Sequence, residues 1–83
     1  MEYHARVEVS LKTGYSDPAG ETTKQSLVQL KYPVKSVSVS ETYTICLEAS
    51  SLTEAEKIVN KMCMRLLANP VKDNFRFEIE EKK

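Results

Sequence analysis

The chain begins with a regular alternation of apolar and polar residues. A period of two over about ten residues predicts a strand with one buried face. A similar alternation near the other end of the chain predicts a last strand of comparable length. The apolar positions are Tyr3, Ala5, Val7, Val9 and Leu11 in the first stretch and Phe75, Phe77 and Ile79 in the last.

A helix is predicted after the first strand. Asp17 can accept hydrogen bonds from the free N–H groups of a first helical turn, and Pro18 suits the first helical position because no needed donor is lost there. The helix is expected to run to about Leu30, since Pro33 disfavours helical geometry at the preceding residue. Its inner face is expected to hold Ala19, Thr23, Leu27 and Leu30.

Two strands are predicted in the middle of the chain. Val34, Val37 and Val39 mark the first of them, with serines on its other side. The second begins near Thr42, and its apolar positions are Tyr43, Ile45, Leu47 and Ala49. The hairpin tip between them is placed at residues 40–42, although these residues lack the Asn-Gly signal of tight turns.

The clearest helical pattern follows. Thr53 and Glu56 match a capping box, with Leu52 placed as a hydrophobic staple before them. Asn69 is expected in the left-handed cap conformation, and Pro70 prevents the helix from continuing. The apolar stripe comprises Ala55, Ile58, Val59, Met62, Cys63, Leu66 and Leu67.

This order predicts one α+β domain over residues 1–83 with the ferredoxin-like arrangement β-α-β-β-α-β. We expect a four-stranded antiparallel sheet with both helices on one face. The first and last strands exceed the usual length of ~5–6 residues, and the outer face of the middle hairpin carries small side chains. Such a sheet can face water, but we expect it to pack against, or be extended by, a second copy in a dimer or tetramer.

The charge balance excludes several functions. Twelve basic and twelve acidic residues cancel, so the chain lacks the positive charge that drives nucleic-acid binding. No run approaches the ~18 consecutive apolar residues of a membrane span. The first residues, MEYHARVEV, lack the apolar core of a signal peptide. We expect a cytoplasmic protein that binds neither nucleic acid nor membrane.

Reactive side chains are few and scattered. The single histidine, His4, lies on the polar face of the first strand, without the partners that metal binding or base catalysis requires. Cys46 and Cys63 lack metal-ligand spacing and are interpreted as reduced packing residues. We therefore expect no catalytic residue, no metal site and no bound cofactor.

Both glycines of the chain, Gly14 and Gly20, lie in the stretch LKTGYSDPAGETT. Their spacing and the residues that follow do not match a phosphate-binding loop, so a rigid joint is favoured over a ligand cradle. Gly14 is expected to supply a positive-φ turn. Gly20 costs helix stability, which indicates a close backbone approach to the chain's own sheet or to a partner. Leucine at position 20 is expected to disrupt packing or assembly, and alanine to have a mild effect.

Two motifs give the sequence a family resemblance. The first comprises Leu11-Lys12, Gly14, Asp17-Pro18 and Gly20, and it resembles the signature of the PurS subunits of phosphoribosylformylglycinamidine synthase. The second is MCMRLLANPV, residues 62–71, which contains Leu67, Asn69 and Pro70 and is similar to that family's Met-Cys-x-x-Leu-Leu-Ala-Asn-Pro-Val. The resemblance covers nearly the whole chain.

The resemblance implies a role in purine synthesis. A glutaminase subunit releases ammonia, and a synthetase subunit uses ATP to convert formylglycinamide ribonucleotide to its amidine. The small subunit would bridge these two partners without catalysing the reaction, and ATP, magnesium and glutamine would be used by the partners. The motif residues Lys12, Gly14, Asp17, Pro18, Gly20, Leu67, Asn69 and Pro70 would serve docking or structure.

One departure and one alternative remain. Many members of the family carry Val-x-Val-Arg-x-Gly-Lys where this chain has Val37-Ser38-Val39-Ser40-Glu41-Thr42. If that region docks on the synthetase in relatives, either its contact differs here or the partner has changed in compensation. The alternative function is an ACT-like domain that senses small molecules, because such domains share the predicted order of elements and use the loop after the first strand.

Overall fold

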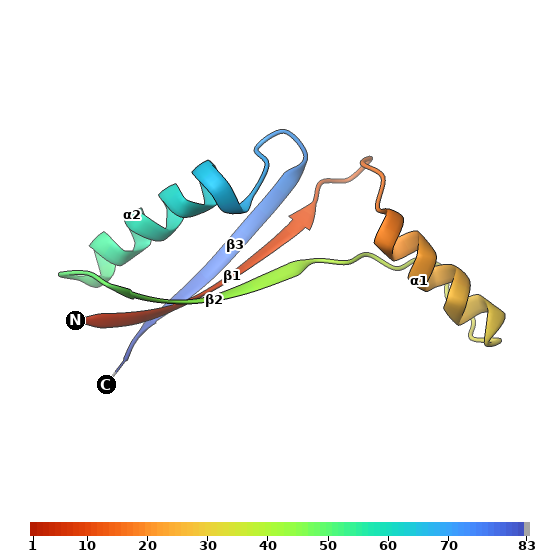
Figure 1. Ribbon diagram of the computed structural model, residues 1–83, viewed down its shortest axis with the longest axis horizontal. Coiled ribbons are helices and arrows are strands. Elements are labelled where there is room, and N and C mark those ends of the chain that lie inside the picture. Colours follow the sequence, from red (N-terminus) through yellow and green to blue (C-terminus); the bar gives the residue numbers. More distant parts are fainter. Residues whose placement is uncertain (83) are drawn as a thin grey trace.

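The computed structural model describes residues 1–82 and contains three strands, two α-helices and one π-helical turn. Figure 1 shows a sheet that is covered by one helix, with the other helix projecting beyond its end. The elements are β1 (Glu2–Leu11), α1 (Pro18–Gln29), β2 (Glu41–Glu48), α2 (Leu52–Met62), the π-helical turn η1 (Cys63–Leu67) and β3 (Asp73–Glu81).

The sheet has the order β2-β1-β3, and both pairings are antiparallel. β1 lies in the centre, where Val7 is opposite Tyr43 on one side and Phe77 on the other. The prediction of long first and last strands is confirmed, since β1 has 10 residues and β3 has 9. Alternate residues of β1 are buried beneath α2, as the period of two requires.

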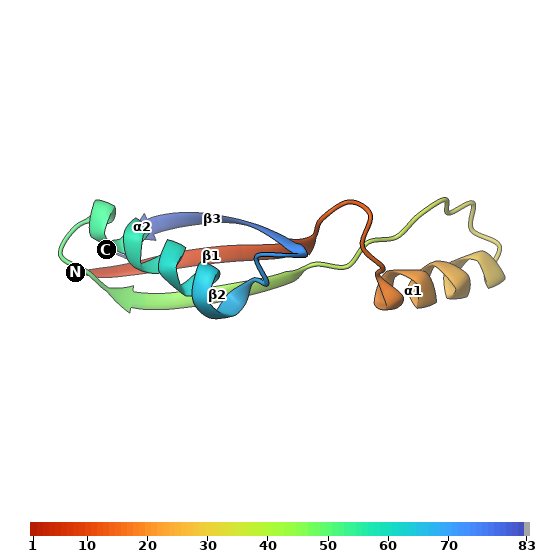
Figure 2. The ribbon, with the colours of Figure 1, turned by 90° about the horizontal axis from the view of Figure 1, so that it is seen from above.

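The predicted fourth strand and its hairpin are wrong for the described chain. Residues 33–40 have no regular secondary structure and return along α1 as a stretched chain (Figure 2). They pair with no strand of the described sheet, and the chain continues from Ser40 directly into β2. The tip lacks residues that favour a tight reversal, so nothing in the local sequence turns the chain back. The sheet of the described residues therefore has three strands, and the order of elements is β-α-β-α-β.

The prediction that both helices cover one face of the sheet is also wrong. α2 lies on the sheet, whereas α1 lies beyond its end (Figures 1 and 2). The molecule measures 51 × 29 × 14 Å as a result. We call α1 together with residues 30–38 the arm, and the sheet with α2 and η1 the body.

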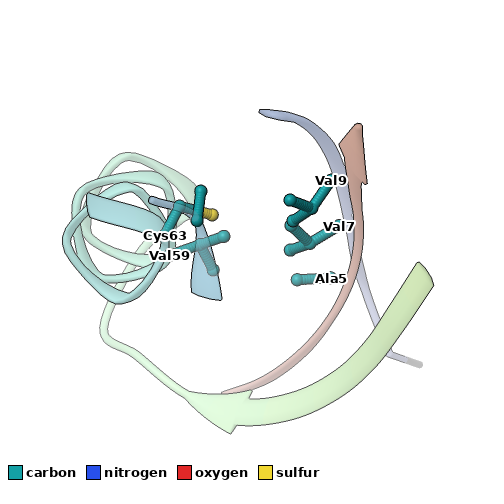
Figure 3. Close-up of a cluster of buried hydrophobic side chains, with 6 residues drawn as sticks. Ala5, Val7, Val9, Val59 and Cys63 are labelled. Atoms are coloured by element: carbon teal, nitrogen blue, oxygen red, sulfur yellow. The ribbon is translucent and has the colours of Figure 1, made fainter. Parts of the chain in front are cut away.

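The core lies between α2 and the sheet. Val59 and Cys63 point at Ala5, Val7 and Val9 of β1 (Figure 3), and all five side chains are buried. A smaller cluster lies nearer the start of α2 and consists of Tyr3, Ala49 and Ala55. The predicted apolar stripe of the second helix thus supplies the core, although Leu66 projects into solvent and is 83% exposed.

The second helix begins two residues earlier than predicted. Its N-cap is Ser51, whose Oγ accepts a hydrogen bond from the N–H of Glu54 at 3.1 Å. The Glu54 carboxylate accepts in turn from the N–H of Ser50. The sequence holds two overlapping Ser/Thr-x-x-Glu patterns, and the first of them, not Thr53 and Glu56, caps the helix.

The two helices also end differently from each other. α2 continues into η1, and the N–H of Ala68 donates to the carbonyl of Cys63 at 2.9 Å. Asn69 is not left-handed, because Lys31 is the one non-glycine residue with positive φ among those described. α1 ends close to the predicted Leu30, and Lys31, with φ 72°, takes the left-handed position after it. No described helix is long and apolar enough to span a bilayer.

Candidate functional site

The two sequence motifs meet at one end of the sheet. Lys12 follows β1, and its backbone N–H donates to the carbonyl of Lys72 at 2.7 Å. Its Nζ donates to the carbonyl of Pro70 at 3.2 Å. Lys12 and Pro70 were both predicted as motif residues, and the fold brings them into contact across 58 positions of the sequence.

The second motif shapes the loop that receives Lys12. The Oδ1 atom of Asn69 accepts a hydrogen bond from the N–H of Val71, and the N–H of Asn69 donates to Oδ2 of Asp73, both at 2.9 Å. Leu67 is half-buried against the core. Asn69 therefore organises a turn after η1. Its partner Asp73 was not singled out in the sequence, because their bond depends on the backbone path between them.

The loop that leaves β1 contains the predicted positive-φ glycine. Gly14 has φ 94°, so that prediction is confirmed. A Cβ at this position would meet no other atom within 4 Å. The requirement for glycine is therefore conformational: other residues rarely adopt this backbone region.

Asp17 forms two backbone contacts through its two carboxylate oxygens. Oδ1 accepts from the N–H of Gly20 at 2.9 Å, which confirms the predicted N-cap, and Pro18 is the first residue of α1. Oδ2 accepts from the N–H of Val39, also at 2.9 Å. The bonds from Val39 and Gly20, in that order of effect, lower the pKa of the Asp17 carboxyl, because both favour its ionised form.

Gly20 fits directly against the extended segment. It is the one buried residue of α1, and a Cβ built on it would overlap the carbonyl oxygen of Val37. The predicted close backbone approach is therefore confirmed, but within the chain it is made to residue 37 of the arm and not to the sheet, which was one of the two expected targets. The expectation that alanine is mild at this position is wrong, because a single methyl group already clashes.

The root of the arm borders a shallow hollow on the body. Asp17 and Val39 line it from the root of the arm, and Leu67 lines it from η1. The site residues thus form two neighbouring groups, one around Lys12 and Pro70 and one around Asp17 and Gly20. The sequence analysis missed Val39 in the second group, since a valine in an alternating stretch carries no signal of its backbone partner.

Reactive groups do not gather at this site. Residues 1–82 contain no group of three or more His, Cys, Asp or Glu residues placed to hold a metal ion. His4 is exposed on the face of the sheet that does not carry α2. Cys46 is exposed, whereas Cys63 is buried, and burial raises the pKa of its thiol. The hydrogen bonds of the site hold the backbone of its loops in place.

Comparisons with known proteins agree with the two motifs. A family model described as PurS, phosphoribosylformylglycinamidine (FGAM) synthase, matches residues 4–81. The PurS subunit of this synthase from Archaeoglobus fulgidus is 46% identical over 68 residues, which span 81% of this chain and 85% of the relative. The corresponding subunit from Bacillus subtilis is 34% identical over 80 residues, spanning 95% of this chain and 94% of the relative.

Solved structures give the same result. PurS from Thermus thermophilus superimposes with a TM-score of 0.87 at 34% identity, over 100% of both chains. A chain in the structure of PurLQS from Thermotoga maritima superimposes with a TM-score of 0.86 at 28% identity, over 96% of this chain and 99% of that one. The resemblance first indicated by the two motifs is thereby confirmed. The chain belongs to the PurS family of phosphoribosylformylglycinamidine synthase subunits, which act in purine biosynthesis.

Proposed function

We propose that this chain is a non-catalytic assembly subunit that bridges the glutaminase and the ATP-dependent synthetase subunits of phosphoribosylformylglycinamidine synthase. The observation that carries the proposal is the likeness to a chain of the Thermotoga maritima PurLQS assembly along nearly the full length of both. By bridging the two partners, the subunit would help ammonia pass from one to the other without loss to solvent. The family assignment favours this role over an ACT-like sensor.

The elongated shape supports a bridging role. The arm extends away from the body (Figure 2). It carries exposed apolar side chains, among them Leu30, which is 67% exposed, and Tyr32, which is 58% exposed. Exposed apolar side chains on a projecting element suit contact with a partner. Within this proposal the complex is cytoplasmic, and ATP, magnesium and glutamine act at the partner subunits, with no cofactor bound by this chain.

A second copy of the chain is proposed as the first partner of the arm. β2 lies at an edge of the sheet, and residues 33–40 continue it in an extended conformation without a strand partner in the described chain. Two copies related by a twofold axis near Ser40 and Glu41 could align residues 33–48 of each chain antiparallel. Each copy would then supply the missing fourth strand of the other.

This exchange also accounts for the position of α1. When residues 33–40 pair with the second copy, α1 is carried to the face of that copy's sheet, beside its α2. The ferredoxin-like arrangement of four strands and two helices would then be completed between chains, as in domain swapping. The short, straight connection at Ser40–Glu41 favours exchange, because it cannot easily reverse within one chain.

Reconstitution tests the bridging role. The glutaminase and synthetase subunits are assayed with glutamine or with ammonia as nitrogen donor, with and without this chain. We expect glutamine-dependent activity to require the chain and ammonia-dependent activity to be independent of it. Equal glutamine-dependent activity without the chain, together with no binding to either partner in sedimentation, would refute the proposal.

A further inference from the structure

The arm is joined to the body by only two stretches of chain. The first is the loop of residues 12–17, which leads from β1 into α1, and the second is the stretch around Val39 and Ser40, which leads back into β2. The two stretches lie next to each other at the root of the arm (Figures 1 and 2). The direction of the arm therefore depends on what holds these two stretches together.

Asp17 forms the direct link between them. It is the last residue before α1, and its Oδ2 accepts the N–H of Val39 at 2.9 Å across 22 positions of the sequence. Its Oδ1 meanwhile caps α1 through the N–H of Gly20. One carboxylate thus ties the first turn of α1 to the returning chain.

Gly20 supports the link from the helix. The absence of a side chain lets the returning chain lie directly against the first turn of α1, with the Val37 carbonyl where a Cβ would be. Val37 and Val39 are two residues apart, so the carbonyl of Val37 lies against Gly20 while the N–H of Val39 reaches Asp17. A shorter side chain at position 17 would lose the bond to Val39. A side chain at position 20 would push the returning chain away from α1.

Other restraints on the direction of the arm are weak. The extensive contacts between elements within residues 1–82 join the strands, α2 and η1, and none involves α1. The loop before α1 contains Gly14 and one internal hydrogen bond, from the N–H of Tyr15 to the carbonyl of Lys12 at 3.3 Å. Such a loop can turn readily unless its end is fixed.

We propose that Asp17, Gly20 and Val39 form a clasp that fixes the direction of the arm relative to the body, so that α1 is presented to its partner in one orientation. The clasp lowers the entropy that the arm loses on assembly, because fewer orientations must be given up. Asp17 is thus a positioning residue. The part played by the clasp in assembly rests on the proposed function, whereas its effect on the direction of the arm does not.

Asp17→Asn removes the bond to Val39 but keeps the helix cap, so the effects of the two contacts can be told apart. An asparagine oxygen can still accept from the N–H of Gly20, since Asn caps helices as well as Asp does. Its second polar atom is an N–H₂ group, which cannot accept from Val39. Gly20→Ala perturbs the same clasp from the helix, because it places a methyl group against the Val37 carbonyl. Glu54→Gln is the matched control, because it alters a carboxylate that accepts the backbone N–H of Ser50, on the body and at the end of the sheet remote from Lys12.

Spin labels at Ser26 on α1 and Lys57 on α2 report the direction of the arm. The labels are introduced in a Cys46→Ser background, and labelled chains are diluted into unlabelled ones so that only distances within one chain are measured. We expect one narrow distribution in the parent and in Glu54→Gln, and a broader distribution in Asp17→Asn and in Gly20→Ala.

Assembly is measured on the same unlabelled variants by sedimentation. We expect the dissociation constants for self-association and for the partner subunits to rise about fivefold or more in Asp17→Asn, the range for loss of one hydrogen bond, and less than twofold in Glu54→Gln. An unbroadened distribution in Asp17→Asn overturns the clasp. A broadened distribution with unchanged assembly overturns its role in presentation. If the parent chain binds neither partner, the proposed function fails while the distance distributions still decide the clasp.

Discussion

At the scale of single residues, two positions show how backbone geometry selects side chains. Asp17 satisfies two separate N–H groups with the two oxygens of one carboxylate, whereas a serine or threonine cap would have to accept both bonds at a single oxygen. Lys31 instead occupies a conformation that favours glycine, with φ 72°. The N–H of Lys31 donates to Val28 and that of Tyr32 donates to Leu27, the two bonds of a Schellman motif.

Acid should weaken the contacts of Asp17. The pKa of this carboxyl is lower in the folded chain than in the unfolded chain, chiefly because of the bond from Val39. Its stabilising contribution is therefore complete above the ordinary aspartate pKa of about 3.9 and is lost as the pH falls through the lower, folded value. We expect the amide chemical shifts of Val39 and Gly20 to titrate together below pH ~4.

The matched measurement uses Asp17→Asn, in which both amides should lose this titration. Local amide signals are needed because the pKa of Glu54 is also lowered, by its hydrogen bonds with Ser50, and global acid unfolding would combine the two effects. A midpoint at or above the ordinary aspartate value would contradict the assignment.

Lys31→Gly should stabilise the arm. Glycine adopts the left-handed region at little cost, and we expect a gain of about 0.5–1 kcal/mol in the local opening free energy of α1. Hydrogen exchange of the α1 amides measures this quantity. Gln29→Gly is a useful control, since it places the same residue inside the helix and should destabilise it by a similar amount. Equal exchange rates in the two variants would argue against the left-handed cap.

At the scale of elements, the two helices differ in how much apolar surface they can bury. α2 and η1 place Val59 and Cys63 against the sheet with no solvent exposure. α1 has the sequence PAGETTKQSLVQ, in which apolar residues are too few and too dispersed to form a continuous stripe. Its position is accordingly set by its connections at the root of the arm and, in our proposal, by a second chain.

Val59→Ala tests how much the core contributes to the free energy of unfolding. The side chain is 0% exposed, so its truncation removes two buried methyl groups and leaves a cavity. We expect a loss of about 2 kcal/mol in the free energy of unfolding. Val71→Ala is the matched control, because Val71 is 69% exposed and should change stability by less than about 0.5 kcal/mol. Urea denaturation of the two variants at one protein concentration makes the comparison.

At the scale of the whole molecule, the shape follows from a hairpin that stays open. The radius of gyration is 16.4 Å, whereas a compact domain of this length has about 12 Å. The excess length is the arm, which lies beyond the body instead of folding back over it (Figure 2). Small domains gain much from further burial, and a second copy offers a means to obtain it.

Closing the hairpin should convert an exchanged dimer into a compact monomer. Ser40→Asn with Glu41→Gly places Asn-Gly between Val39 and Thr42, the strongest signal for a two-residue turn. We expect sedimentation to change from dimer to monomer, with a smaller radius of gyration in X-ray scattering. Ser40→Thr with Glu41→Gln changes the same positions without a turn signal and should leave the dimer intact. A parent chain that is monomeric at high concentration would contradict the exchange.

Much of the local structure could be predicted from the sequence. Period-two alternation located β1 and β3, Asp17-Pro18 located the start of α1, and Gly14 located a positive-φ turn, because each depends on neighbouring residues alone. The capping box of α2 was placed two residues late, since two overlapping patterns compete and the backbone path from β2 decides between them. The contact of Asp17 with Val39 could not be predicted, because it joins residues whose proximity depends on the path of the arm.

The sequence by itself determined β1, β2 and β3, the two helices, the core face of α2 and the family, because alternation, capping and motif residues act over a few positions or survive as a recognisable string. Only the tertiary structure decided that residues 33–40 leave the sheet, that α1 lies off its end, and that the two motifs meet through Lys12 and Pro70. The physical reason is that a hairpin closes or stays open by a balance between a weak turn and long-range contacts. Local patterns report the turn, but those contacts exist only once the chain is folded.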